Sequence, residues 1–235
     1  MLASVSALEG VPSALAAARD GIDARLRDRG RRLTGRDVTR ESLWRGAVAS
    51  ASLAGSNCTA ADLWNGRADP VATGCLRLSA ELLGLLPTWR VSPLQVLARM
   101  HTLASDDALP SYARGRPTGP AGAARLRQLA GTLARPTTAP ALAVAAIVHA
   151  EVATVEPFGT ADGVVARATE RLLLVDRGVD PASVIVPESG HAADPTAYQE
   201  ALAAYAAGGT SGVTHWLLYA ARAFTQAAQA APLPD

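Results

Sequence analysis

Apolar residues recur every three or four positions through most of the chain, and no stretch shows sustained alternation of apolar and polar residues. The first spacing places apolar side chains on one face of a helix, whereas alternation would indicate a strand. The sequence therefore predicts an all-α fold. Helices are expected over residues 13–28, 40–53, 59–64, 72–85, 92–104, 139–155, 163–177, 195–207 and 212–230.

Residue types at the expected helix starts agree with this pattern. Ser92-Pro93 and Asp194-Pro195 each place an N-cap residue before a proline at the first helical position, and Thr59 with Asp62 resembles a capping pair. Between residues 106 and 122, glycines and prolines crowd into the run Gly115-Arg116-Pro117-Thr118-Gly119-Pro120. This segment is expected to be an irregular loop or a short hairpin.

The chain of 235 residues fits one large domain, or one domain with a helical annex, because single cores stop growing near about 250–300 residues. Hydrophobic residues make up 49% and charged residues 18%, which is typical of a folded protein with a sizeable core. We expect a helical extension over residues 1–38, the main domain over 39–228 and a frayed tail over 229–235.

Formal net charge is +1, which argues against a general binder of nucleic acid or of anionic membranes. All 22 basic residues are arginine, a bias like that of GC-rich bacterial genomes. The absence of lysine excludes a Schiff base, a catalytic lysine and a Walker-type phosphate loop.

Only two cysteines occur, Cys58 and Cys75, too few for a zinc knuckle. The N-terminus lacks the basic and apolar regions of a signal peptide, and no run of about 18 apolar residues occurs. We therefore expect a cytoplasmic protein that makes no use of a membrane.

The most informative stretch covers residues 149–167. An apolar helix runs into Glu156-Pro157, a glycine-containing loop follows, and a second helix opens near Gly163. Unpaired N–H groups and the helix dipole make such an N-terminus a binding site for anions, with phosphate the natural guest. Arg167, one turn inside the second helix, can reach back toward that anion.

This stretch resembles the signature of the Fic (filamentation induced by cAMP) family, His-Pro-Phe-x-Asp/Glu-Gly-Asn-Gly-Arg-x-x-Arg. Pro157, Phe158, Gly163 and Arg167 match it position by position. The other positions depart from it: Glu156 replaces the catalytic histidine, Thr160 the metal-binding acid, Ala161 a glycine, Asp162 the asparagine and Val164 the first arginine. The motif is degenerate in its chemistry.

Other segments extend the resemblance over residues 40–224. His149 and His101 lie on helices that precede the motif, Tyr198 and Trp216 on helices that follow it, and Tyr112 and Arg114 where the family has a flap that aligns its substrate. Residues 47–55 resemble the inhibitory helix of the family, Ser/Thr-x-x-x-Glu-Gly, with Ser50 and Gly55 in place. Ala54 stands where the inhibitory glutamate would pair with the distal arginine.

The resemblance implies transfer of AMP to a protein hydroxyl, with a nucleotide and magnesium. Because the histidine is replaced, we expect impaired transfer and a protein that binds a nucleotide or another phosphate ligand for regulation. Gly159, Thr160, Ala161, Gly163 and Arg167 would hold the phosphate. Alternatively, Glu156 and Asp162 are catalytic carboxylates of a modified enzyme that acts on a phosphate-containing substrate. A third hypothesis is a helical protein that binds a protein partner or a second copy of itself through the apolar segment 216–218.

Several residues also have plain structural interpretations. His149 is a core histidine bonded to backbone, or a base that replaces the lost histidine. Arg167 is an anion ligand, or the ion-pair partner of Glu156 or Asp162. Asp162 is the cap of the second helix, or a magnesium ligand together with Glu156 and Thr160. We favour the cap and assign no metal site; Phe158 is expected to be a core anchor.

Overall fold

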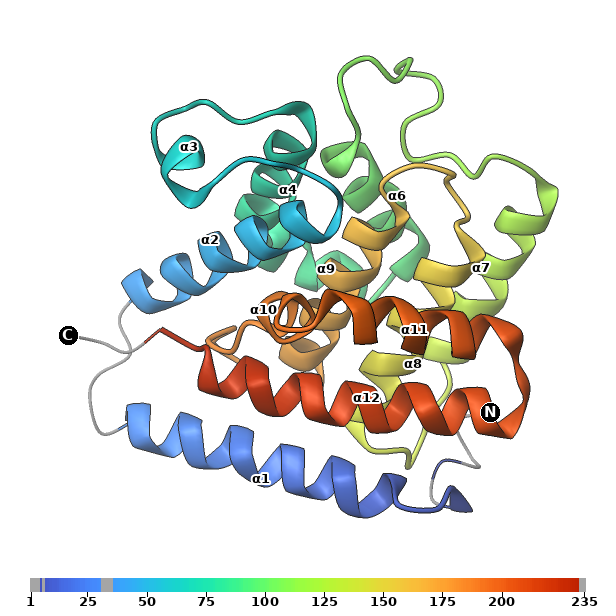
Figure 1. The fold of residues 1–235 in the computed structure, drawn as a ribbon. Coiled ribbons are helices and arrows are strands. Elements are labelled where there is room, and N and C mark those ends of the chain that lie inside the picture. The colour runs from blue at the N-terminus through green and yellow to red at the C-terminus, as the bar shows by residue number, and fades with distance from the viewer. Residues whose placement is uncertain (1–4, 6, 31–35, 233–235) are drawn as a thin grey trace.

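A computed structural model describes residues 5, 7–30 and 36–232, so the ends of the expected extension and tail, and the connection at 31–35, lie outside the described residues. Within those ranges all regular structure is helical (Figure 1), which confirms the predicted all-α fold.

The helices occur in the following order along the chain. They are α1 (Val11–Gly30), α2 (Arg36–Leu53), α3 (Ala60–Trp64), α4 (Pro70–Glu81), the 3₁₀ helix η2 (Leu82–Leu85), α5 (Leu86–Trp89), α6 (Pro93–Ala104), α7 (Pro120–Leu133), α8 (Ala141–Val155), α9 (Asp162–Asp176), α10 (Pro187–Ala192), α11 (Pro195–Ala207) and α12 (Gly209–Gln229).

Helices α8 and α9 pack against each other at the centre of the molecule. Every residue of α8 from 142 to 152, and every residue of α9 from 164 to 175, is buried. A helix that is covered on all sides needs neighbours all round: α6, α2 and α4 contact α9, whereas α11, α12 and α7 contact α8. The connection between α8 and α9 is the glycine-containing segment singled out in the sequence.

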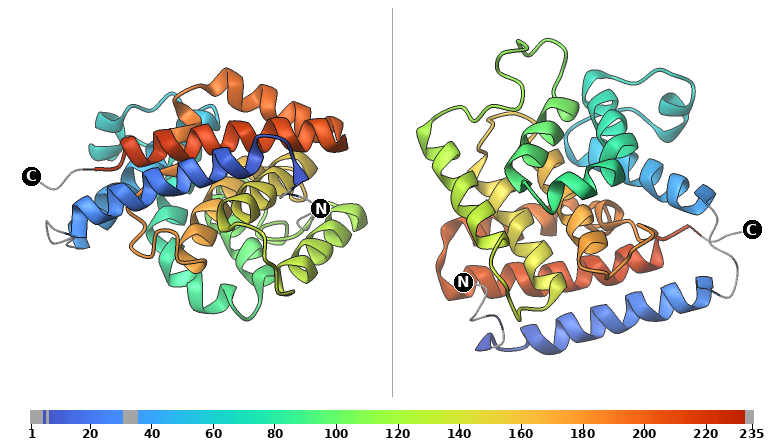
Figure 2. Two further views of the ribbon diagram at one scale, coloured as in Figure 1. Left: turned by 90° about the horizontal axis from the view of Figure 1, so that it is seen from below. Right: turned by 180° about the vertical axis from the view of Figure 1, so that it is seen from behind.

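Helix α1 lies along α12 on one side of the molecule, in all three views of Figures 1 and 2. Val11, Leu15, Ala18 and Ile22 of α1 are buried and belong to the same hydrophobic core as α8 and α9. The expected N-terminal helix is therefore integral to the fold of the described residues.

The predicted helices correspond to α1–α4, α6, α8, α9, α11 and α12, with ends within a few residues; the segment predicted at 72–85 divides into α4 and η2. Sequence patterns missed α5, α7 and α10. Helix α7 was missed because its first turn contains a proline and a glycine, which usually indicate a loop. Pro120 is the first residue of the helix. A Cβ on Gly122 would lie 2.9 Å from the carbonyl oxygen of Pro157. Gly122 thus permits close packing instead of breaking the helix.

Two of the three expected caps form. Thr59 and Asp62 make a complete capping box, and the Asp194 carboxylate accepts a hydrogen bond from the Ala197 N–H. Ser92 occupies the expected N-cap position but its hydroxyl makes no capping bond.

The apolar segment 216–218 is not the exposed face that a dimer would need. Trp216 and Leu217 are fully buried, and the indole N–H of Trp216 donates to the Ala146 carbonyl at 2.8 Å. The placement of a dimer surface there was wrong, because the apolar side of α12 is covered by α8 and α11.

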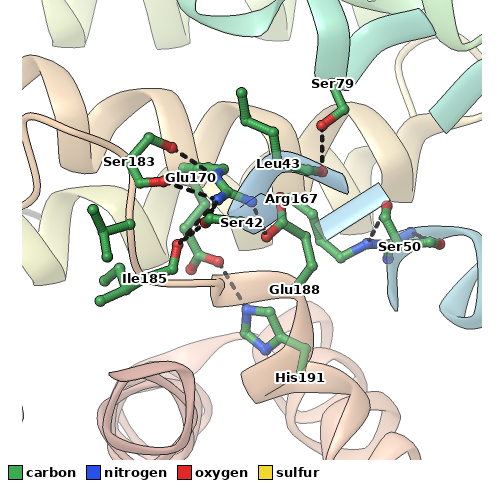
Figure 3. A network of polar contacts seen from close by, with 12 residues as sticks. Ser42, Leu43, Ser50, Ser79, Arg167, Glu170, Ser183, Ile185, Glu188 and His191 are labelled. Atoms are coloured by element: carbon green, nitrogen blue, oxygen red, sulfur yellow. Dashed lines mark hydrogen bonds and ion pairs between the residues drawn. The ribbon is translucent and has the colours of Figure 1, made fainter. Parts of the chain in front are cut away.

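A buried guanidinium fastens three helices together. Arg171 of α9 donates to the Glu188 carboxylate of α10 at 2.9 Å, to the Ser183 hydroxyl at 2.8 Å and to the Ser42 hydroxyl of α2. Figure 3 shows Ser42, Ser183, Ile185 and Glu188 close to one another. Because Arg171 is 1% exposed, these partners, and not water, must stabilise its positive charge.

Replacing Glu188 with glutamine should lower the free energy of unfolding by about 3–5 kcal/mol, because the buried charge of Arg171 loses its counterion. The matched control is Glu41→Gln, which breaks an exposed pair with Arg45 and should cost less than about 1 kcal/mol. Urea denaturation measures both. Equal losses in the two variants would contradict the structural role given to Arg171.

Candidate functional site

The loop between α8 and α9 has an unusual backbone. Glu156, the C-cap of α8, has φ 48°, and Ala161, the N-cap of α9, has φ 54°; Gly159 between them has φ 73°. Glycine adopts positive φ freely, whereas Glu156 and Ala161 do so at a cost of about 1–2 kcal/mol each. Such strain persists where surrounding structure fixes the loop and is frequent at functional sites.

This loop borders a cavity of about 310 Å³. The cavity walls come from the end of α2, the end of α8, the loop, the first turns of α9 and the first turns of α11. Its lining includes every predicted site residue outside the flap: Glu156, Gly159, Thr160, Ala161, Asp162, Gly163 and Arg167. Ala54 and Tyr198 complete the wall beside Arg167.

Helix α9 begins at this cavity without a side-chain cap. Ala161 has no side chain that could accept a hydrogen bond, and the first helical bond runs from the Val165 N–H to the Ala161 carbonyl. The N–H groups of Asp162, Gly163 and Val164 therefore have no partner within the helix. Together with the helix dipole they favour a negatively charged ligand.

Arg167 lies beside this helix start but forms neither of the ion pairs considered for it. Its Nε donates to the Ser50 hydroxyl and its Nη2 to the Ser50 carbonyl, both at 3.0 Å, and its Nη1 lies 3.3 Å from the Tyr198 hydroxyl (Figure 3 shows the contact with Ser50). The side chain is 2% exposed. Among the described residues no carboxylate lies within ion-pair distance of Arg167, so its charge has only neutral partners.

Close packing at Gly163 leaves room for this guanidinium. A Cβ at residue 163 would lie 3.3 Å from Arg167 Nη1. Ser50 lies in the last turn of α2 and Ala54 directly follows that helix, in the segment that resembles an inhibitory helix. The segment does reach Arg167, but it does so through Ser50, since the methyl group of Ala54 offers no charge.

The sequence suggested that Asp162 caps α9, but the N-cap residue is Ala161. Asp162 is the first helical residue, and its Oδ1 accepts the Phe158 N–H at 3.0 Å, which ties the loop back onto the helix. Its Oδ2 is buried without a hydrogen-bond partner. Burial raises the pKa of Asp162 to about 6; the N–H groups of Phe158 and Gly159 lower it in part, and the charge of Glu156 adds to the increase.

Glu156 and Thr160 lie at the open side of the cavity, and both are exposed. The Thr160 hydroxyl lies 3.1 Å from His101 Nε2, and the Gly115 N–H donates to His101 Nδ1 at 2.8 Å. A ring nitrogen that accepts carries no hydrogen, so Nε2 of the neutral imidazole is the donor to Thr160. His101 also stacks on Phe158, which is buried as expected.

The predicted flap is an irregular loop between α6 and α7, without the hairpin considered for it. Its Gly115 and Thr118 N–H groups bond to His101 and to the Pro157 carbonyl, so the loop lies against the site. Arg114 does not point into the cavity: it holds the loop together by donating to the carbonyls of Leu109 and Asp107. Tyr112 is 74% exposed at the surface of the loop.

Sequence reasoning missed a buried polar cluster behind the cavity. His149 is buried as expected, but its partners are the Tyr198 hydroxyl and Glu170 instead of backbone groups. His149, Glu170 and His191 offer ligand atoms within 4.8 Å of one another, the composition of a metal site. Glu170 Oε2, however, makes a hydrogen bond of 2.8 Å with His191 Nε2 and lies 3.1 Å from His149 Nδ1, an ion-pair distance, so the three groups already contact one another.

A resident magnesium ion does not fit the residues of the cavity. Magnesium prefers oxygen ligands in octahedral geometry. The position at which the resemblance places an acid is Thr160, whose hydroxyl is engaged by His101, and Asp162 directs Oδ1 to backbone N–H groups. Magnesium at this site would therefore have to arrive with the phosphates of a nucleotide.

Comparison with solved structures places this arrangement in a known fold class. A crystal structure of a Fic family protein from Desulfovibrio desulfuricans G20 matches with a TM-score of 0.72 and 18% sequence identity, over 90% of this chain and 73% of that chain. A fragment of Fic-1 from C. elegans matches with a TM-score of 0.67 and 16% identity, over 93% of this chain and 72% of that chain. The chain has the fold of Fic family proteins, and the resemblance found in the sequence is confirmed at the level of the fold.

The sequence itself matches no family model and no curated protein. Among the described residues, no helix combines the length and the apolar character that crossing a membrane requires.

Replacing Ala161 with glycine should raise the free energy of unfolding by about 0.5–1 kcal/mol, because glycine removes the cost of positive φ. The matched control is Ala203→Gly, an exposed alanine in the interior of α11, where glycine should cost about 1 kcal/mol. Thermal and urea unfolding measure both. A loss of stability in Ala161→Gly comparable to the control would show that residue 161 is not left-handed.

The raised pKa of Asp162 predicts that the free energy of unfolding depends on pH. The folded state holds the proton up to about pH 6 while the unfolded state releases it near 3.8, so stability falls as pH rises through this window. Asp162→Asn should remove that fall and stabilise the protein at pH 8 by roughly 1–3 kcal/mol, with little effect at pH 4. Unfolding measured at several pH values tests this; a wild-type and a variant profile that run parallel would contradict it.

Proposed function

We propose that this Fic-fold protein binds a phosphate-bearing ligand, of which a nucleotide is the natural class, in the cavity at the start of α9. Arg167 carries the proposal: it is a buried guanidinium that borders a cavity, has neutral partners only and adjoins an uncapped helix N-terminus. A buried charge without a carboxylate in direct contact is costly, so an anionic ligand in the cavity would gain from both features.

We further propose that AMP transfer is impaired and that the protein acts by binding. Glu156 stands at the exposed end of α8, where the resemblance places a histidine that accepts a proton. A carboxylate is in general a weaker base than an imidazole, and the negative charge of Glu156 repels a triphosphate. The exposed loop with Tyr112 would then contact a protein partner instead of aligning a substrate.

One observation favours a second candidate, a modified enzyme that uses Glu156 and Asp162. The two carboxylates line one cavity, and burial raises the pKa of Asp162 to about 6, as a general acid near neutral pH requires. In this alternative, Asp162 would donate a proton to a leaving group of a phosphate-containing substrate while Glu156 accepts one.

Thermal-shift measurements with ATP, ADP, AMP and inorganic phosphate, with and without magnesium, test the binding proposal. A ligand at 100 times its dissociation constant stabilises the folded state by about 2.7 kcal/mol, which corresponds to a shift of several degrees. Arg167→Gln should abolish the shift, whereas Arg125→Gln, which breaks a partly exposed pair with Glu151 away from the cavity, should leave it.

The outcomes separate the two candidates. Absence of a shift with every ligand would contradict phosphate binding. Saturable labelling of a protein by labelled ATP, lost in Glu156→Ala, would contradict the proposed impairment and favour the modified enzyme.

A further inference from the structure

A chain of polar contacts leads from the cavity wall into the core. Arg167 Nη1 lies 3.3 Å from the Tyr198 hydroxyl, and both residues line the cavity. The same hydroxyl lies 2.8 Å from His149 Nε2, and Nδ1 of that imidazole lies 3.1 Å from Glu170 Oε2. Arginine and glutamate are thereby connected through one phenol and one imidazole.

The chain continues beyond Glu170. His191 Nε2 lies 2.8 Å from the same Oε2 (Figure 3), and His191 Nδ1 lies 3.1 Å from the Tyr219 hydroxyl of α12. Glu170 Oε1 is buried with no hydrogen-bond partner. His149, Glu170 and His191, hereafter the histidine–glutamate cluster, come from α8, α9 and α10 and are each 0% exposed.

Charge balance explains why these groups occur together. Arg167 carries one positive charge and Glu170 one negative charge, and with both imidazoles neutral the buried set is neutral as a whole. Burial lowers the pKa of His149 to about 4. Burial alone would raise the pKa of Glu170, but the two neighbouring histidines outweigh this effect and lower the pKa to about 2. Arg167 is therefore compensated at a distance, by a carboxylate on the far side of Tyr198 and His149.

We propose that binding of an oxyanion beside Arg167 is coupled to uptake of a proton by the histidine–glutamate cluster. This inference rests on the proposed function, because it concerns the same cavity. The oxyanion takes over the compensation of Arg167 and leaves the charge of Glu170 unbalanced in a medium of low dielectric constant. A proton on one of the two imidazoles adjacent to Glu170 restores the balance, and the oxyanion itself favours the imidazolium.

Other charged or titratable groups near the chain must be separated from this effect. They are Asp162 on α9 and Glu156 at the end of α8, both in the cavity; Cys75 on α4, whose pKa is raised to about 11 by burial; Asp194 before α11; and Arg222 on α12, near Tyr219. Of these, Asp162 and Glu156 can also take up a proton when an anion enters.

Sulfate is the appropriate probe, because its charge does not change between pH 5 and 8. The chain has four histidines, so NMR of protein labelled at histidine resolves each titration, with exposed His215 as an internal reference. Saturating sulfate should raise the pKa of His149 or His191 by about one unit and leave that of His215 unchanged. The affinity for sulfate should rise as the pH falls, by about tenfold in total, because a shift of one pKa unit corresponds to a tenfold change in affinity.

Variants identify which groups take up the proton. In the double variant Glu156→Gln, Asp162→Asn the coupling should persist, because the cluster is intact. Tyr198→Phe removes the connection between Arg167 and His149 and should reduce proton uptake at least twofold, measured by calorimetry in buffers of different ionisation enthalpy. Tyr205→Phe, on the same helix with its hydroxyl on Glu151, is the matched control and should behave as wild type.

Each outcome decides the matter. If sulfate shifts the amide signal of Gly163 but leaves the titrations of His149 and His191 unchanged, the coupling is overturned and the proposed function is not. Loss of proton uptake in the double variant assigns it to the cavity carboxylates and also overturns the coupling. Absence of any shift at Gly163 with sulfate, phosphate or ATP overturns the proposed function and, with it, this inference.

Discussion

A buried arginine without an acidic partner is the constraint on which the rest of the site depends. Arg167 is held by Ser50 at the end of α2 and by Tyr198 on α11, so three helices must come together to place one guanidinium. Neutral acceptors satisfy its hydrogen bonds but do not neutralise its charge. That residual charge favours an anionic ligand in the cavity that Arg167 borders.

The two buried arginines of α9 serve different purposes, although they lie one turn apart. Arg171 meets Glu188 directly and fastens α2 and α10 to α9, which is a structural arrangement complete in itself. Arg167 meets no carboxylate and borders a cavity. The comparison shows why the presence of an arginine in a helix says little about function until its partners are known.

The geometry of the loop before α9 depends mainly on its backbone. Ala161 is in a left-handed conformation that suits glycine better, and Asp162 keeps the backbone contacts to Phe158 that close the loop. The uncapped helix start that results is a property of the backbone, so it survives replacement of the side chains around it.

The sequence by itself determined the all-α class, nine of the helices and the residues that surround the cavity, because helical periodicity and the loop before Gly163 are local properties. It also indicated that the end of α2 would face Arg167. Only the tertiary structure decided what Arg167 binds, that Asp162 joins loop to helix, and that His149 meets Glu170 and His191. Those contacts join residues that are distant along the chain, and nothing in the periodicity of one helix specifies which polar group of another helix it will face.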